Sequence, residues 1–297
     1  MKTSNHLLRR LTAALLAAVL ALSIALPVFA SDDGDTIYIN SVSDLLSLAR
    51  NCAYDQWSVG KTVILQKDLS LEGMLWEPIP SFSGQFKGNG HTISDLTITG
   101  QYSPAGLFGI VEEQGSIESL SVRGVVSVSD SADTTTGGIV GVNHGTLINC
   151  QFTGVVTGDS EVGGIVGRNE SEGTIDHGTA RAIVTGKSST GGIAGYNLGA
   201  ITGCTNVGSI NTEYPEASLD TDGFTAKMVD YINNKMAAAD NDATNSVTNV
   251  ATDTGGIAGR SSGMILTSVN TGTIGYEHVG YNVGGIVGRT DGLVSGC

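Results

Sequence analysis

The residues best suited to chemistry do not fall at the spacings that catalysis or metal binding requires. The zinc-protease pattern His-Glu-x-x-His is absent. No Gly-x-Ser-x-Gly elbow lies between a strand and a helix, and the glycine pairs match neither the Rossmann nor the P-loop pattern because no helix follows them. The five histidines fall in different segments: His6, His91, His144, His177 and His278. We therefore predict no catalytic residue, no cofactor, no metal ion and no enzyme activity, with His144 and His177 as solvated turn residues.

One acidic segment has a partial likeness to a calcium-binding loop. Residues 240–245 read Asp-Asn-Asp-Ala-Thr-Asn, which brings several oxygen ligands close together. The sixth position is Asn245 where an EF-hand has glycine, and the twelfth is Ala251 where it has the bidentate Glu. The segment is a weak candidate, and we predict no metal site in it.

Three arginines share one position of a repeated string. Arg168, Arg260 and Arg289 each follow the string's last glycine, and Val142 and Tyr196 hold that position in two other copies. A stripe of arginines on one outer face would suit an acidic glycan, since polysaccharide-cleaving β-helices gather charged residues in this way. Solvated surface charges are the favoured interpretation.

The string itself, Gly-Gly-Ile-(Val/Ala)-Gly, sets the period of the chain. It begins at residues 137, 163, 191, 255 and 284, and the variant Ala105–Gly109 precedes them. Successive starts are 32, 26, 28, 64 and 29 residues apart, where the 64 reflects a long insertion. A second glycine follows each string, with an apolar residue two positions after it and a β-branched residue eleven positions after it in each complete unit.

Each unit is predicted to form three short strands separated by turns, in which glycine supplies the positive φ of the corners. A unit this short buries a core by stacking on identical units. The predicted fold is all-β: a right-handed parallel β-helix of about six coils, with an N-terminal capping helix and one helical insertion. A β-propeller needs longer, four-stranded blades, and a β-sandwich of hairpins shows no fixed repeat.

One column of polar residues follows from this alignment. Asn143, Asn169 and Asn197 align with Ser261 and Thr290. Their side chains are expected to hydrogen-bond from coil to coil and to suit left-handed corners.

The cysteines fall in another column. Cys150, Cys204 and Cys297 share it with Gly178 and Ser268, so successive cysteines lie two rungs apart, about 9–10 Å. A disulfide needs Cα atoms within about 7 Å. We therefore predict buried free thiols; Cys52 lies outside the repeats.

The segments outside the repeats have predictable roles. Thr36–Asn40 alternates as a strand, Ser41–Asp44 resembles a capping box ahead of an amphipathic helix, and Thr62–Leu65 and Thr92–Thr99 supply the first strands. Within the insertion, apolar residues recur at helical spacing: Phe224, Met228, Tyr231, Ile232 and Met236. A helix packed on the flank is favoured there over a partner-binding element.

The first 30 residues predict export. Two arginines precede the apolar run 11–26, which is short for a membrane span of about 20 residues, and a small-residue cleavage site follows. This segment holds three of the 15 Lys+Arg and none of the 29 Asp+Glu, so residues 31–297 carry a formal charge of −17. Such a chain repels nucleic acid and anionic membranes, and we predict a secreted protein associated with the cell surface.

The predicted organisation divides the chain into five parts. They are a signal peptide at 1–30, an N-terminal cap with the first coils at 31–100, repeats at 101–211, an insertion with a helix at 212–254, and repeats at 255–297 that stop inside a unit. An uncovered last coil predicts that the sequence is part of a longer chain.

The repeats resemble a known family. The pattern Gly-Gly-Ile-Val-Gly-x-Asn-x-Gly-x-Ile-x-x-Cys and the variant Gly106–Gly109 are similar to the GLUG repeat, and residues 82–93 resemble the segment that precedes such repeats, with Lys87 where Asp is usual. The resemblance covers about residues 82–297. It implies a bacterial surface protein or adhesin, because GLUG repeats occur there and beside immunoglobulin A metallopeptidases of the M26 type.

The predicted function is a secreted or cell-surface, non-catalytic stalk or adhesin-like module that binds a host or matrix protein or a glycan. Two alternatives stay open: a β-helix polysaccharide lyase or hydrolase, and the N-terminal accessory region of a larger surface metallopeptidase. The zinc motif of that peptidase is not in this sequence, so the resemblance transfers no activity.

Overall fold

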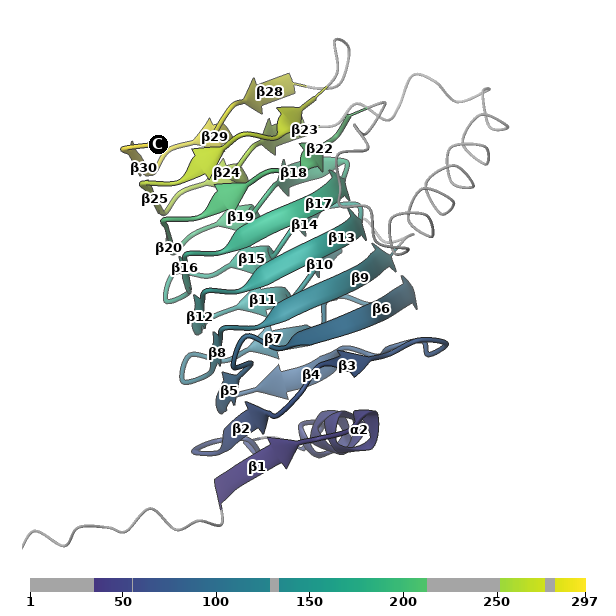
Figure 1. The fold of residues 1–297 in the computed structure, drawn as a ribbon. Helices are drawn as coiled ribbons and strands as arrows, with labels where there is room; N and C mark the ends of the chain where they lie inside the picture. Colours follow the sequence, from purple (N-terminus) through teal and green to yellow (C-terminus); the bar gives the residue numbers. More distant parts are fainter. Residues whose placement is uncertain (1–34, 55, 129–133, 213–251, 276–280) are drawn as a thin grey trace, which may run out of the picture. The chain divides into compact units, whose positions relative to one another are not determined.

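The chain winds into a parallel β-solenoid of about seven turns with a single short helix among the described residues, close to the predicted six coils. A computed structural model describes residues 35–54, 56–128, 134–212, 252–275 and 281–297. In Figure 1 the coils follow one another from β1 to β30, each strand lying beside its counterpart in the next coil. The predicted parallel β-helix is confirmed.

Four sheets run through the coils. Sheet A holds β1 (Thr36–Ile39), β2 (Thr62–Leu65), β5 (Gln85–Lys87), β8 (Ser116–Glu118), β12 (Thr146–Ile148), β16 (Thr174–Asp176), β20 (Ala200–Thr202), β25 (Met264–Leu266) and β30 (Leu293–Ser295). Sheet B holds β3 (Leu69–Ser70), β6 (Thr92–Gly100), β9 (Ser121–Val128), β13 (Gln151–Thr157), β17 (Thr179–Thr185), β21 (Thr205–Asn206), β22 (Ser209–Ile210), β26 (Val269–Asn270) and β27 (Thr273–Ile274). Sheet C holds β4 (Ile79–Phe82), β7 (Phe108–Val111), β11 (Val140–Asn143), β15 (Val166–Asn169), β19 (Ala194–Asn197), β24 (Ala258–Ser261) and β29 (Val287–Thr290).

Sheet D is an addition to the predicted three strands per coil. It holds β10 (Thr135–Gly137), β14 (Glu161–Gly163), β18 (Ser188–Gly191), β23 (Thr252–Gly255) and β28 (Tyr281–Gly284). Each of these short strands ends on the first glycine of the repeated string, where the sequence pattern is polar and glycine-rich rather than apolar. The prediction of three strands per coil was therefore wrong for the repeats. The first glycine of each string ends a fourth strand, and the glycine after it lies in the corner that follows.

Glycine is required at these positions because other backbone atoms approach them too closely to leave room for a Cβ. A Cβ on Gly163 would lie 1.9 Å from the carbonyl oxygen of Val166, and one on Gly164 would lie 2.2 Å from that of Gly192. None of the glycines in the five strings has a positive φ, so the expectation that glycine supplies the left-handed corners is met by other glycines, such as Gly203 and Gly296, and not by these. A column of corner residues between sheets A and B adopts the left-handed conformation instead: Ser119, Asn149, His177, Gly203, Thr267 and Gly296.

Apolar columns fill the space between the sheets. Ile117, Leu147, Ile175, Ile201 and Ile265 are fully buried, and they lie on neighbouring strands of sheet A. The early coils hold larger side chains in their core. The rings of Phe82, Phe86 and Phe108 pack against one another there, with centroids 5.4 to 6.3 Å apart. In-register stacking thus gives each short coil the core that it lacks alone.

The predicted capping helix is present as α2 (Val42–Asn51). Ser41 is its N-cap and accepts a hydrogen bond from the Asp44 backbone amide, while the Asp44 carboxylate accepts one from the Asn40 amide at 2.9 Å. The hydrogen bond from the Asn40 amide lowers the pKa of Asp44 most, and one that the Ser41 hydroxyl donates to the same carboxylate lowers it further. Leu45 and Leu48 are buried in the core cluster, so the helix covers the apolar end of the first coils.

The register of the strands places Gly178 between Cys150 and Cys204. Both cysteines are free and buried, and Cys52 is too, which confirms free thiols. Cys297 is free but exposed, so its predicted burial was wrong: it lies in the last described coil, where no described strand packs over its column. Burial raises the pKa of Cys150 and Cys204 to about 12.

Three predictions lie outside the described residues. They are the signal peptide, most of the insertion with its helix, and the acidic segment 240–245.

Candidate binding surface

The outer face of sheet C carries the predicted arginine column. Hydrogen-bonded register aligns Val142, Arg168, Tyr196, Arg260 and Arg289 on consecutive strands. Neighbouring strands lie about 4.8 Å apart, so the column offers one side chain per rung at that spacing. The prediction that these positions stack into one column is confirmed.

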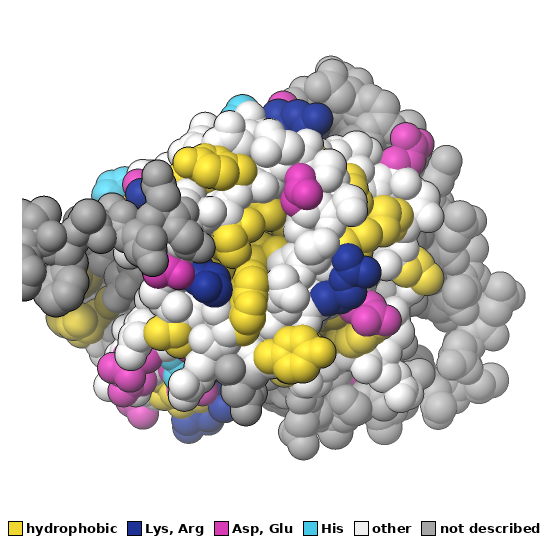
Figure 2. Space-filling model, turned by 90° about the horizontal axis from the view of Figure 1, so that it is seen from below, with side chains coloured by type: hydrophobic (Ala, Val, Ile, Leu, Met, Phe, Trp, Pro, Cys, Tyr) yellow, Lys and Arg dark blue, Asp and Glu magenta, His cyan; other side chains and the backbone are white. Residues whose placement is uncertain are grey.

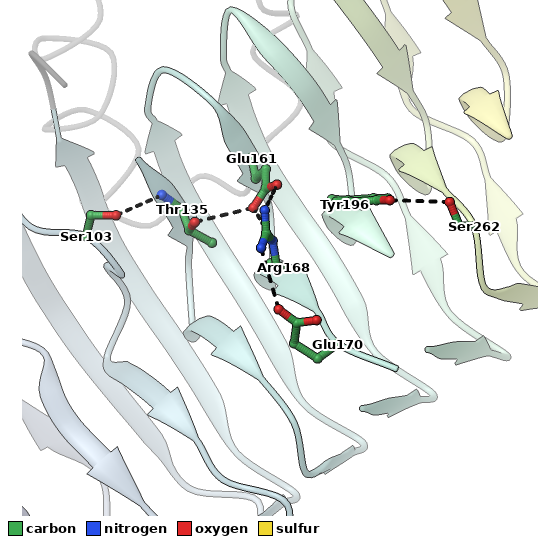
Figure 3. Close-up of polar contacts among 7 residues, drawn as sticks. All are labelled: Ser103, Thr135, Glu161, Arg168, Glu170, Tyr196 and Ser262. Carbon is green, nitrogen blue, oxygen red and sulfur yellow. Dashed lines mark hydrogen bonds and ion pairs between the residues drawn. The ribbon is translucent and has the colours of Figure 1, made fainter. Parts of the chain in front are cut away.

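Arg168 is held by two carboxylates. Its Nε donates to Glu161 Oε2 at 2.6 Å, a second nitrogen pairs with the other Glu161 oxygen, and Nη1 lies 3.6 Å from Glu170 Oε1. Figure 3 shows the guanidinium between the two acids, with Thr135 also donating to Glu161 at 3.3 Å. The hydrogen bonds from Arg168 to Glu161 raise the pKa of the guanidinium. This arginine is therefore fixed in place by its own coil.

Tyr196 lies between two arginines of the column. The guanidinium carbon of Arg168 is 5.8 Å from the ring centroid and that of Arg260 is 5.1 Å. Both distances are within the range of cation–π attraction. The phenol oxygen lies 3.3 Å from Ser262 Oγ (Figure 3), which ties the ring to the corner after β24. The stack therefore holds three side chains in a defined arrangement.

Arg260 and Arg289 occupy adjacent rungs at the far end of the column. The exposed Asp291 lies near both arginines. A hydrogen bond with Ser262 lowers the pKa of its carboxylate most, and the charges of Arg260 and Arg289 lower that pKa further. Like charges directly opposite each other on paired strands repel. The charges of Arg260 and Arg289 are thus less neutralised by neighbouring carboxylates than the charge of Arg168, which pairs with Glu161 and Glu170.

The asparagine column lies on the inner side of the same strands. Asn143 Nδ2 donates to Asn169 Oδ1 at 2.8 Å, Asn169 Nδ2 donates to Asn197 Oδ1 at 2.8 Å, and Asn197 Nδ2 donates to Ser261 Oγ at 3.1 Å. All four residues are fully buried. The predicted ladder is confirmed, but its asparagines end strands with ordinary φ, so their predicted left-handed conformation was wrong.

The three histidines that the structure describes are not brought together. His91 Nδ1 lies 3.2 Å from Asp68 and His177 Nδ1 lies 2.9 Å from Asp176, on different coils. His144 lies in the corner between β11 and β12. Within the described ranges, no group of three or more His, Cys, Asp or Glu is placed to hold a metal ion.

An apolar groove lies at the end that α2 covers. Figure 2 shows hydrophobic side chains gathered in the middle of this face. The groove is lined by residues of α2, of the turn after it and of the segment before β4, among them Leu46, Ala49, Tyr54, Leu75 and Pro78. Tyr54 and Leu75 are each 72% exposed. The lining offers apolar contact but no cluster of reactive groups.

Sequence reasoning missed the partners of the arginine column. Glu161, Glu170, Ser262 and Asp291 stand at corners and in sheet D, which the three-strand prediction did not contain. Glu161 lies seven residues before Arg168, a separation that becomes a contact when β14 turns sharply into β15. A search for acids flanking each Arg-bearing string would have found Glu161, Glu170 and Asp291.

No protein-family model matches the chain. It is 30% identical over 155 residues to halomucin of Haloquadratum walsbyi, an alignment that covers 48% of this chain and 2% of halomucin. It is 29% identical over 137 residues to a protein of Evansella cellulosilytica named "Putative Gly-rich membrane protein", covering 33% of this chain and 16% of that protein. The chain therefore spans a small part of the length of both relatives.

A solved structure has a similar fold. It is described as that of a "putative immunoglobulin A1 protease" from Bacteroides ovatus, with a TM-score of 0.54, 17% identity, and coverage of 88% of this chain and 77% of that one. At this identity the likeness establishes the fold alone.

Among the described helices, none has the length and apolar character needed to cross a membrane.

Proposed function

We propose that the chain is a non-catalytic β-solenoid module of a larger extracellular surface protein, built from GLUG-type repeats and acting as a stalk or adhesin-like binding region. The observation that carries the proposal is the division of polar groups between the two sides of sheet C. The inner asparagines hydrogen-bond to one another and to backbone from coil to coil, while the outer column from Arg168 to Arg289 presents guanidinium and phenol groups.

The similarity to halomucin and to a Gly-rich membrane protein supports a place at the cell surface. Both alignments cover a minor part of those proteins, which suits a module within a longer chain. A stack of coils also holds binding groups at a fixed spacing away from its attachment point.

Binding of the purified protein to immobilised matrix proteins and to a panel of glycans tests the proposal. We expect saturable binding to at least one surface and no turnover of any glycan in the panel. Cleavage of a polysaccharide would support the lyase or hydrolase alternative instead. Uniform failure to bind would leave a spacer role.

A second candidate function is the accessory region of a surface peptidase. It is favoured by the fold that the chain shares with the Bacteroides ovatus structure. Reading the coding sequence beyond Cys297 tests it most cheaply: a zinc-protease motif supports this role, and a wall-anchoring segment supports the stalk or adhesin.

A further inference from the structure

The open end of the arginine column is the part of the outer face best suited to a ligand. Arg260 lies on β24, between β19 and β29, and Arg289 lies beside it on β29. Arg289 is exposed. Two planar guanidinium groups on neighbouring strands, whose backbones lie about 4.8 Å apart, match anionic groups that accept paired hydrogen bonds.

The rest of the column supports Arg260. Arg168 is fixed by Glu161 and Glu170, and Tyr196 is fixed between Arg168 and Arg260. Arg260 therefore rests against a ring that also contacts Arg168 and, through its hydroxyl, Ser262. A side chain held in its binding position loses less conformational entropy when a ligand arrives, which increases affinity.

We propose that Arg260 and Arg289, with Tyr196 as the supporting wall, bind the carboxylate or sulfate groups of an acidic polysaccharide that lies along the outer face of sheet C. This inference rests on the proposed binding function and names the ligand class of that module. Asp291 stays hydrogen-bonded with Ser262 beside the site. Because residues 31–297 carry a formal charge of −17, the polymer is repelled from the rest of the surface and binds where the two arginines lie side by side.

The sheet face favours a polysaccharide over an acidic peptide. Peptides that bind sheets commonly add a strand to an exposed edge. β24, which carries Arg260, is paired on both sides, with β19 and β29, so its backbone offers no such edge. β29, which carries Arg289, is paired only with β24 among the described strands, but a peptide added to its free edge would lie beyond Arg289 and could not lie over both arginines. Recognition on this face comes from side chains alone, and a polymer with an anionic group on each sugar meets one side chain per rung.

The test measures binding of the purified protein to four polymers at low salt. They are polygalacturonate, which carries carboxylates, dextran sulfate, neutral dextran and polyglutamate. We expect binding to polygalacturonate, dextran sulfate or both, weakened by added salt because exposed charges are screened. The two polyanions distinguish carboxylate from sulfate recognition.

Three variants assign the binding to the column. Arg260→Gln and Arg289→Gln should each weaken polyanion binding about tenfold, since one charge-assisted contact is lost. Arg289→Lys should bind better than Arg289→Gln and less well than the parent, because lysine keeps the charge and loses the planar fork. The control is Arg181→Gln, at an exposed arginine on β17 of sheet B, which should bind as the parent does.

Four results would overturn the inference: no binding to either polyanion, equal binding to neutral dextran, equal or tighter binding to polyglutamate, or an equal loss in the Arg181 control. Binding to a matrix protein or neutral glycan without binding to polyanions would overturn this inference and leave the proposed function standing. Because Arg289 is exposed at the last described rung, its variants are expected to fold, and circular dichroism checks this.

Discussion

The inner and outer columns of sheet C sit on neighbouring residues of the same strands and behave differently. Asn169 points inward, is fully buried, and is hydrogen-bonded to the asparagines of both neighbouring coils. Arg168, next to it, points outward and its side chain is 38% exposed. One strand therefore supplies a structural amide and a surface cation within two residues.

The difference shows where sequence variation is tolerated. The inner column keeps Asn, Asn, Asn and Ser because an unpaired buried amide or hydroxyl costs free energy. The outer column changes from Val142 to arginine and tyrosine, since solvent or a ligand satisfies whatever stands there. Polar residues inside the solenoid stabilise the stack, and polar residues outside it are available for binding.

The largest expected effect comes from the corner glycines that bring the strands together. Gly164→Ala would place a Cβ 2.2 Å from the Gly192 carbonyl oxygen, and we expect a loss of about 3 kcal/mol or more in the free energy of unfolding. The matched control is Gly285→Ala, at the same position of the last string, where nothing lies within 4 Å of the added Cβ. It should be neutral or stabilising by up to about 1 kcal/mol. Equal losses in denaturant unfolding would refute close approach as the reason for the motif.

The next effect concerns the inner column itself. Asn169→Leu removes the hydrogen bonds to Asn143, Asn197 and the Gly173 carbonyl, so we expect a loss of about 2–3 kcal/mol. Ser261→Ala, at the end of the ladder, should cost about 1 kcal/mol because one partner is affected. If the two variants unfold alike, position in the ladder does not matter.

A smaller effect is expected on the outer face. Arg168→Gln leaves the Glu161 side chain, 13% exposed, without its guanidinium partner. Because the arginine is partly solvated, we expect a loss of about 1 kcal/mol. Arg181→Gln should change the stability by less than about 0.5 kcal/mol. A double-mutant cycle with Glu161→Gln measures the pair, and a coupling near zero would contradict the role given to Glu161.

The smallest effect at neutral pH concerns the thiols. The pKa of Cys204 is raised from 9.0 to about 12 by burial, so the unfolded chain loses this proton at a lower pH than the folded protein does. Stability is therefore unaffected below about pH 9 and falls as the pH rises toward 12. Cys204→Ala should lessen that fall.

A thiol reagent at neutral pH should label the exposed Cys297 much faster than Cys150 or Cys204, and rapid labelling of all three would show that the columns are not packed.

Much of the fold was predictable because its signals are periodic. The spacing of Ile117, Leu147 and Ile175 gives the register of sheet A directly, and the capping pattern at Ser41 gives α2. Sheet D was not predictable from apolar periodicity, since Thr135–Gly137 and its counterparts are polar and glycine-rich. Their strand conformation depends on contact with neighbouring coils rather than on local propensity.

The candidate surface was predictable as a column but not as a network. The repeat alignment places Arg168, Arg260 and Arg289 in one row. The alignment did not predict the contact of Glu161 with Arg168. That contact depends on how sharply the chain turns between β14 and β15, which the repeat pattern does not specify. Tyr196 stood in the same row, but its contacts with both arginines depend on side-chain directions.

The central claim is that the inner polar column holds the fold while the outer one binds. The most direct test titrates polygalacturonate and dextran sulfate into Asn169→Leu and Arg260→Gln, at a temperature where circular dichroism shows both to be folded. We predict that Asn169→Leu binds as the parent protein does although it melts at a lower temperature, and that Arg260→Gln melts near the parent and binds about tenfold more weakly. If both properties fall together in either variant, the two columns are not separable and the account is wrong.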